Sequence, residues 1–314
     1  MTSLPNPMSF ESQRLVRQRL LELAGLLAPN EGYNPTGLPG LRILRTETVL
    51  HDVPVLYKPG AVFVLQGRKQ GILEGDAYLY DEEHYLSVSV PVPFRMESVA
   101  SVDRPLLAIY VEFDMPLAAE IASLIEKRSS GTSVSKARSL VSSKMGPDIL
   151  DVLLRLLKAL IDPVETAVLG KSILRELHYR VLVGPQGGAM ISALQQRGTL
   201  GKIVQSLARL RETYRSDVSV AALASDAGMS IPSYHAHFKA LTGSSPMQYV
   251  KAMRLHEARL MIARQDMAIA EVALSVGYVS PAQFSRDFKR HFRRTASEEA
   301  RWVRQHLGAL AFGA

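Results

Sequence analysis

The sequence contains no cysteine, which removes a set of possible chemistries from its 314 residues. Disulfide bonds, thiolate metal sites and cysteine nucleophiles are excluded, and the absence is compatible with a reducing cytoplasm. No run of about 18 apolar residues is present either, so no membrane-spanning helix is expected. Residues 1–7 are polar and rich in proline, and we therefore expect no secretory signal peptide.

The sequence also lacks the short motifs by which many enzymes are recognised. It has no glycine-rich phosphate loop, no dinucleotide-binding fingerprint and no arrangement typical of a Ser-His-Asp triad. We therefore expect no catalytic residue and no bound cofactor.

Positive charge is concentrated in the last part of the chain. Residues 1–190 contain 20 Lys and Arg against 21 Asp and Glu, whereas residues 191–314 contain 17 basic and 9 acidic residues. The net charge of +7 therefore comes from the second part, which alone carries +8. Such an excess favours a nucleic-acid partner, because Lys and Arg neutralise backbone phosphates.

Residues 41–114 have the pattern of a β domain. Short apolar or alternating segments are separated by Pro, Gly and Asp, and residues 86–90 (Leu-Ser-Val-Ser-Val) alternate with a period of two. Many short strands at close spacing predict a sandwich or a barrel. Residues 29–40, rich in Pro, Gly and Asn, are expected to form a loop. The clearest predicted strands cover residues 53–57, 61–65, 77–80, 86–90 and 106–113.

Helical periodicity precedes and follows this β region, so the predicted class is α+β. A polar loop is expected over residues 129–135, and the glycine-rich residues 184–188 interrupt the helical pattern. We place the domain boundary there, giving domains 1–190 and 191–314. The predicted helices cover residues 9–28, 117–127, 148–160, 164–183 and, after the boundary, 189–215.

The second domain contains one helix-turn-helix pattern twice, over residues 219–241 and 268–292. Gly228 recurs as Gly277, forty-nine positions on, and four further pairs are each fifty positions apart. These pairs are Ser230 and Ser280, Tyr234 and Phe284, Phe238 and Phe288, and Lys239 and Lys289. A glycine can end a helix with a positive φ, and a serine can cap the next one. One such pattern is a weak signal, but two in register strongly predict a pair of DNA-reading units.

The second helix of such a unit enters the major groove with its N-terminal part. The aromatic core positions fix which side chains face outward. In the first unit the candidate DNA-binding residues are Pro232, Ser233, His235, Ala236 and Lys239. In the second unit they are Pro281, Ala282, Ser285, Arg286, Lys289 and Arg290. Arg286 can bond bidentately to guanine, whereas the flanking Lys and Arg are expected to bind phosphate.

Residues 246–264 are predicted to form one continuous helix between the two units. Its stiffness would set the distance between the recognition helices, which must be about 34 Å to read successive major grooves on one face. The outward positions of the first unit offer few hydrogen bonds. We therefore expect specificity to depend on the second unit, or in part on DNA shape.

The paired units resemble those of the AraC family of bacterial transcription regulators. Residues 54–57 with 64–69, and residues 174–187, resemble the N-terminal domain and connecting region of one AraC subfamily. One departure is that Arg293-Arg294-Thr295-Ala296 follows the second unit, where the family usually has Gly and then Pro. The strings that carry the resemblance are Ala227-Gly228-Met229-Ser230, Phe238-Lys239, Thr242-Gly243, Arg254-Leu255, Val276-Gly277-Tyr278 and Gln283-Phe284-Ser285-Arg286.

The resemblance implies a cupin-like β-barrel or sandwich with packed helices, followed by an all-α domain that binds specific double-stranded DNA. In the wider family the β domain senses a small molecule or mediates dimerisation. A small-molecule effector, a second copy of the chain and RNA polymerase are thus candidate partners, and the cytoplasm is the expected location. Within the β domain, candidate ligand contacts are Tyr57, Gln66, Tyr78, His84 and Arg95.

Two alternatives stand beside this interpretation. The first is a cupin-type enzyme with an appended DNA-binding domain. Metal-dependent cupins use a His-x-His pair, and the β region has only His51 and His84, which form no such pair, so no metal is expected. The second alternative is a non-specific architectural DNA binder, which the modest charge of +8 and the orderly outward faces disfavour.

Overall fold

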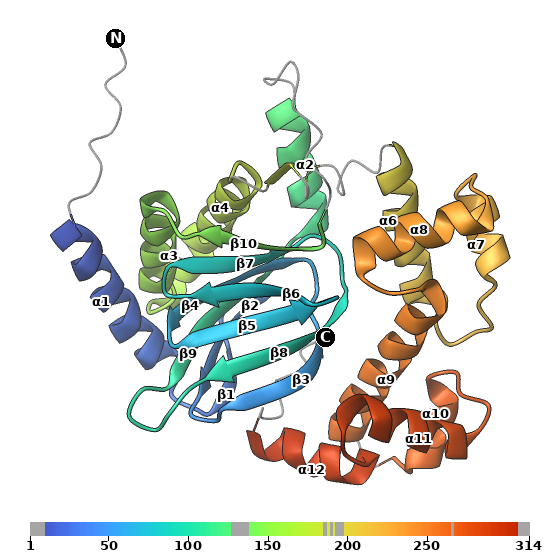
Figure 1. Cartoon of the computed structure of the whole chain (residues 1–314). Helices are drawn as coiled ribbons and strands as arrows, with labels where there is room; N and C mark the ends of the chain where they lie inside the picture. The colour runs from blue at the N-terminus through green and yellow to red at the C-terminus, as the bar shows by residue number, and fades with distance from the viewer. Residues whose placement is uncertain are drawn as a thin grey trace.

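The computed structural model describes a β-rich part followed by a helical part (Figure 1). This arrangement confirms the predicted α+β class. The described residues are 10–126, 138–184, 187–188, 191, 198–264 and 267–306.

The β-rich part contains two antiparallel sheets. The larger sheet has the order β1(Gly32–Pro35), β2(Leu41–Thr46), β9(Leu106–Glu112), β4(Gly60–Gln66), β7(His84–Val88) and β10(Leu140–Lys144). The smaller sheet has the order β3(Leu50–Leu56), β8(Pro93–Val99), β5(Arg68–Leu73) and β6(Asp76–Asp81). Several neighbouring strands within each sheet are not consecutive in the sequence, because the chain crosses between the two sheets. This order is typical of a β-sandwich.

Both faces of the larger sheet are buried. In β4, Val62 and Val64 pack into the core of the sandwich, while Phe63 and Leu65 pack toward the helices. The alternation of β4 is therefore hidden in the sequence, because both faces are apolar. The same core that holds Phe63 and Leu65 includes buried residues of α1(Phe10–Leu27), α2(Met115–Glu126), α3(Pro147–Ala159) and α4(Pro163–Leu182).

Two edge strands differ from the sequence-based expectation. β1 lies in the region expected to be a loop, and β10 lies between the expected helices 117–127 and 148–160, where the sequence predicts no element. Each is short and pairs with a single neighbour, so neither shows a strong local signal. Each of these strands is identified by its pairing with the neighbouring strand. In β10, for example, Leu140 pairs with Val88 of β7. The polar loop predicted over residues 129–135 lies outside the described residues.

The helical part contains both predicted units. The first consists of α7(Val220–Asp226) and α8(Ile231–Thr242), and the second of α10(Ile269–Ser275) and α11(Pro281–Phe292). The long α9(Pro246–Arg264) joins them, as predicted, and Figure 1 shows it running from one unit to the other. α6(Gly198–Thr213) precedes the pair, and α12(Ala296–His306) follows it. The proposed boundary at residue 190 falls between α4 and α6, mostly outside the described residues.

The helical part is docked against the smaller sheet. The Tyr249 hydroxyl on α9 donates a hydrogen bond to the Pro91 carbonyl at 2.9 Å, and the Arg259 guanidinium donates to the Pro54 carbonyl at 3.2 Å. Buried apolar residues of the sandwich interior and of the helical part form one continuous core. α9 therefore belongs both to the pair of helix-turn-helix units and to the interface with the β domain.

Candidate DNA-binding surface and interdomain pocket

The first candidate recognition helix is α8. The Ser230 hydroxyl caps it by accepting a hydrogen bond from the Ser233 N–H, and Pro232 occupies an early position where its missing N–H costs nothing. Tyr234 and Phe238 are fully buried. The opposite face is therefore the outer one, and at its end Lys239 pairs with Glu74 of the β domain at 3.8 Å. Its candidate contacts are the exposed Pro232, Ala236 and Lys239 and the half-buried Ser233 and His235.

The second candidate recognition helix is α11, capped by Ser280 in the same way. Phe284, Phe288 and Phe292 stack along its inner side, with successive ring centroids 5.4 and 4.6 Å apart. This aromatic ridge fixes the rotation of the helix, and it leaves six candidate contacts exposed. They are Pro281, Ala282, Ser285, Arg286, Lys289 and Arg290.

These exposed polar groups differ in how fully they are already engaged. The Ser285 hydroxyl donates to the Pro281 carbonyl at 3.0 Å, and Arg290 forms an ion pair with the buried Asp287 at 2.7 Å. Arg286 forms no ion pair within the described part of the chain. Its guanidinium thus retains its full hydrogen-bonding capacity for an incoming partner.

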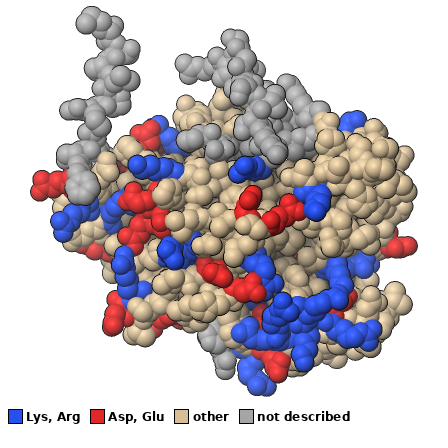
Figure 2. Space-filling model, in the orientation of Figure 1, with Lys and Arg blue, Asp and Glu red and all other residues tan. Residues whose placement is uncertain are grey.

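Figure 2 shows basic side chains gathered over the lower part of this face, where α11 and α12 lie. Acidic and basic side chains are mixed over the β domain in the same view. The exposed basic residues of α11 and the turn after it include Arg286, Lys289, Arg290 and Arg293. A positive surface around a recognition helix is what contact with a phosphate backbone requires.

One arginine of α9 holds both units together. The Arg254 guanidinium donates to the carbonyls of Tyr214 at 2.6 Å and Ser216 at 2.7 Å, just before the first unit, and of Gly277 at 2.9 Å, in the turn of the second. Gly277 has a φ of 90°, and a Cβ there would lie 2.4 Å from the Arg215 carbonyl oxygen. Only glycine fits this close approach, so the turn of the second unit packs against the backbone that leads into the first unit.

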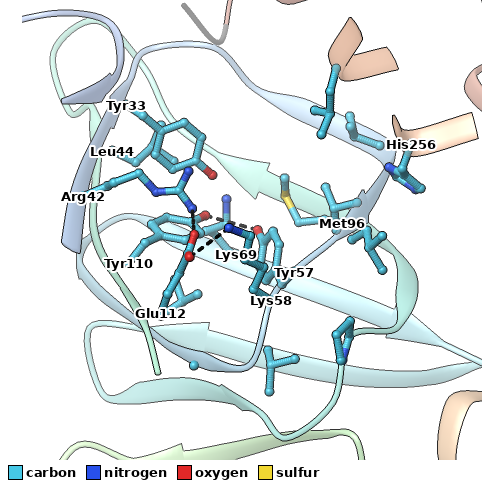
Figure 3. Close-up of a pocket in the computed structure, with 18 of the residues that line it drawn as sticks. Tyr33, Arg42, Leu44, Tyr57, Lys58, Lys69, Met96, Tyr110, Glu112 and His256 are labelled. Atoms are coloured by element: carbon cyan, nitrogen blue, oxygen red, sulfur yellow. Dashed lines mark hydrogen bonds and ion pairs between the residues drawn. The ribbon is translucent and has the colours of Figure 1, made fainter. Parts of the chain in front are cut away.

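A pocket of about 190 Å³ lies between the β domain and α9. Strands of both sheets supply most of its wall. The helical side consists of Arg211 of α6 and of Tyr249, Met253, His256, Glu257, Arg259 and Leu260 of α9. Figure 3 shows Tyr33, Tyr57 and Tyr110 on the side of the strands. The pocket is therefore shared between the two parts of the molecule.

Tyrosine rings form one wall of this pocket. The Tyr57 and Tyr110 hydroxyls are hydrogen-bonded at 3.1 Å, and the Tyr33 and Tyr110 rings meet edge to face with centroids 5.0 Å apart. Burial raises the pKa of all three phenols, so they are uncharged at neutral pH. The wall combines aromatic surface with neutral hydroxyl groups.

The pocket also contains a lysine that the sequence did not single out as a ligand contact. Lys69 of β5 is 1% exposed, and its Nζ lies 5.8 Å from the centroid of the Tyr110 ring. Burial lowers the pKa of Lys69 to about 7. At the same pocket, Glu112 pairs with Arg42 at 2.9 Å and with Lys58 at 3.1 Å (Figure 3).

Of the five ligand contacts expected from the sequence, only Tyr57 lines this pocket. The Gln66 amide donates to the Pro105 carbonyl, and His84 pairs with Asp81. Arg95 forms an ion pair with Asp52 and lines a separate hollow beside α11. Tyr78 lies on β6, outside the residues that line the pocket.

Lys69 and Tyr33 could not have been found by sequence pattern. Lys69 stands between Arg68 and Gln70, so the segment is polar throughout and shows no inward face. Tyr33 lies in the region expected to be a loop. The structural reason is pairing: Lys69 stands opposite the buried Tyr80, which places it on the inner side of the smaller sheet.

Two further observations bear on the class of protein. Among the described residues, no group of three or more His, Asp or Glu could hold a metal ion. No helix in that part of the chain is both long and apolar enough to cross a membrane.

Comparison with known proteins agrees with both parts of this architecture. Residues 37–189 match the model of the AraC-type transcriptional regulator N-terminus, and residues 223–301 match a helix-turn-helix domain model. The transcriptional activator RhaS of Salmonella schwarzengrund is 31% identical over 91 residues, 29% of this chain and 33% of that protein. The activator RclR of Escherichia coli is 36% identical over 87 residues, 28% of this chain and 31% of that protein. The match thus spans only about a third of each relative.

A solved structure with the same overall fold is that of ToxT from Vibrio cholerae with an unsaturated fatty acid bound. It superposes with a TM-score of 0.57 over 86% of this chain and 97% of that chain, at 11% sequence identity. The likeness at this identity concerns the fold.

A β domain followed by paired helix-turn-helix units on one long helix defines a class of two-domain regulators. Within that class the chain belongs to the AraC family. The family's usual Gly after the second unit is replaced here by Arg293, which nevertheless adopts the left-handed conformation, with a φ of 61°.

Proposed function

We propose that this protein is a sequence-specific DNA-binding transcription regulator that reads two successive major grooves. The observation that carries the proposal is the pair of capped recognition helices, α8 and α11. Each has an exposed outer face, and the single long helix α9 joins their units. The three hydrogen bonds of Arg254 support a fixed relation between the units. The exposed faces of α8 and α11 are the proposed DNA contacts.

The two faces are proposed to contribute unequally. Pro232 and Ala236 on α8 offer van der Waals contact, whereas Arg286 on α11 can recognise guanine through two hydrogen bonds. Lys289 stands one turn further along, and we assign it to the phosphate backbone. Specificity should therefore come mainly from α11.

Selection of bound sequences from a random DNA pool tests this proposal. Wild-type protein should enrich a defined motif, and Arg286→Ala should cost about 1–3 kcal/mol and relax one base position. Lys289→Ala should weaken binding to all sequences alike and reduce its salt dependence. Arg19→Ala, an exposed arginine of α1, is the matched control and should bind like the wild type. Enrichment of no motif by the wild-type protein would contradict the proposal.

We further propose that the pocket between the β domain and α9 receives a small-molecule effector. A molecule there would touch Tyr110 of the β domain and Met253 of α9 together, so its binding would be coupled to the position of the DNA-reading part. The fatty acid bound by ToxT, a protein of the same fold, supports an effector in this class of architecture.

The curated relatives are activators, which favours regulation over catalysis for this chain as well. A second copy of the chain and RNA polymerase complete the proposed partners, and the cytoplasm is the proposed location. Gel filtration with and without operator DNA would test self-association directly.

A further inference from the structure

Lys69 is a buried cation without a counter-ion. It is 1% exposed, and among the described residues it forms no ion pair. The loss of solvent around its ammonium group lowers the pKa of Lys69. A buried ammonium group without a partner is costly, and proteins retain such groups mainly where they have a function.

Two carboxylates near the pocket are already paired with cations, and Glu257 of α9 also lines the pocket. Glu112 lies between Arg42 and Lys58, and Glu299 is paired with Arg259 at 2.7 Å on the side of α12. Each of these two carboxylates also faces a second cation, because Arg294 lies 3.3 Å from Glu299. The charged residues that line the pocket are Arg42, Lys58, Lys69, Arg211 and Arg259 against Glu112 and Glu257, so cations outnumber anions there. Lys69 is 1% exposed and packs beside the Tyr110 ring.

Size and wall chemistry restrict what could supply the missing anion. The volume is about 190 Å³, and a cavity of roughly 150 Å³ is sufficient for benzene. Edge-to-face tyrosine rings suit a planar ring, and Leu44, Val62 and Met96 add apolar surface. One charged group on an apolar body would match Lys69 together with these apolar and aromatic walls.

We propose that the pocket binds a small aromatic monocarboxylic acid, whose carboxylate pairs with the Lys69 ammonium and whose ring packs against Tyr57 and Tyr110. This inference rests on the proposed function, because it names the chemical class of the effector. The bound ring would also meet Met253 of α9, so the ligand bridges the two domains.

Proton uptake is a direct consequence of this pairing. Lys69 is about half protonated at neutral pH when the pocket is free, since its pKa is about 7. A carboxylate beside it would restore the ammonium form, because an opposite charge favours ionisation. At pH 8, binding should therefore take up close to one proton per ligand, and a purely structural lysine would show no such uptake.

Calorimetric titration of the full-length protein with benzoate, phenylacetate and the uncharged analogue benzamide tests the proposal. At least one of the acids should bind and benzamide should not, and heats in buffers of different ionisation enthalpy should reveal the proton uptake at pH 8. Lys69→Met should lower the affinity for the acid by about tenfold or more. Lys144→Met, an exposed lysine on β10, is the matched control and should titrate like the wild type.

Three results would each overturn the inference. They are binding of neither acid, equal binding of benzamide and the acids, and unchanged affinity in the Lys69→Met protein. Circular dichroism and DNA binding of Lys69→Met establish that the variant is folded. If DNA selectivity persists while the acids fail to bind, the inference alone is wrong. If no DNA motif is enriched, the proposed function itself is wrong.

Discussion

Arg293 ends α11 in the left-handed conformation that glycine adopts at the end of α8, where Gly243 has a φ of 74°. A side chain makes this conformation unfavourable by about 1–2 kcal/mol. We predict that Arg293→Gly stabilises the protein by up to about 1 kcal/mol, because the greater freedom of glycine in the unfolded chain offsets part of the gain. Urea denaturation measures the difference.

The converse change serves as the control for this prediction. Gly228 has a φ of 63°, and a Cβ there would meet only the flexible end of Lys202. Gly228→Ala should therefore be destabilising by about 1 kcal/mol through backbone strain alone. Unchanged stability in both variants would show that these turns tolerate side chains freely.

Lys69 offers a second prediction at the scale of one residue. Without ligand, Lys69→Met should stabilise the protein by about 1–3 kcal/mol at pH 7, because an apolar chain of similar shape replaces a buried amine. The pKa of Lys69 is about 7 in the folded protein and ordinary in the unfolded chain. Between these values the unfolded chain binds the extra proton, so wild-type stability rises with pH and the advantage of Lys69→Met shrinks.

The variant that loses ligand binding is thus expected to be the more stable one, as is common where a binding site keeps an unfavourable group. Denaturation curves of both proteins at pH 7 and pH 9 provide the measurement. A stability difference that stays constant over this range would mean that Lys69 is charged in the folded protein.

At the scale of the element, α9 matters because Arg254 fixes both units to it. Arg254→Lys keeps the positive charge but cannot reach the carbonyls of Tyr214, Ser216 and Gly277 together. We predict a loss of about 2 kcal/mol in stability. Affinity should fall more for DNA carrying the complete site than for DNA carrying one half-site, because only the complete site depends on the relation between the units.

Arg301→Lys, on the exposed side of α12, is the matched control for this measurement and should leave both affinities unchanged. Equal losses on complete and half-sites would assign Arg254 to folding alone. Fluorescence anisotropy with both duplexes distinguishes the two outcomes.

Elements with an internal signal were predictable from the sequence, and elements defined by a neighbour were not. The capping serines and aromatic ridges of α8 and α11 are local, so both units were recognised with their outward faces. β1 and β10 are short edge strands, and the partner of β10 is distant in the sequence. The inward position of Lys69 depends on its pairing opposite Tyr80, which no pattern around residue 69 records.

At the scale of the whole molecule, two histidines lie where α9 and α11 meet the β domain. The His256 and His291 Nε2 atoms are 3.3 Å apart. Burial lowers the pKa of both, that of His291 to about 4, and the nearby Arg95, Arg259 and Lys251 lower the pKa of His291 further. Both rings are therefore neutral in the folded protein at pH 6.

Acid should loosen this contact. As the pH falls from about 6.5 to 4, histidines of the unfolded chain gain protons while His256 and His291 remain neutral, so the folded state loses stability. We predict that His291→Gln reduces this acid sensitivity, as measured by denaturant midpoints at pH 7.5 and pH 5. His237→Gln, an exposed position on α8, should retain the sensitivity of the wild type.

The shared wall of the pocket has a consequence for domain exchange. Tyr249, Met253 and His256 belong to the same helix that carries the DNA-reading units, while Tyr33, Tyr57 and Lys69 belong to the strands. In a chimera joined near residue 190, the protein that supplies the DNA-binding part would also supply α9 and the pocket residues on it. Combining the ligand response of one regulator with the DNA site of another would therefore require a hybrid α9. The pocket-facing residues of this helix would come from the protein that supplies the β domain, and its two ends from the protein that supplies the recognition helices.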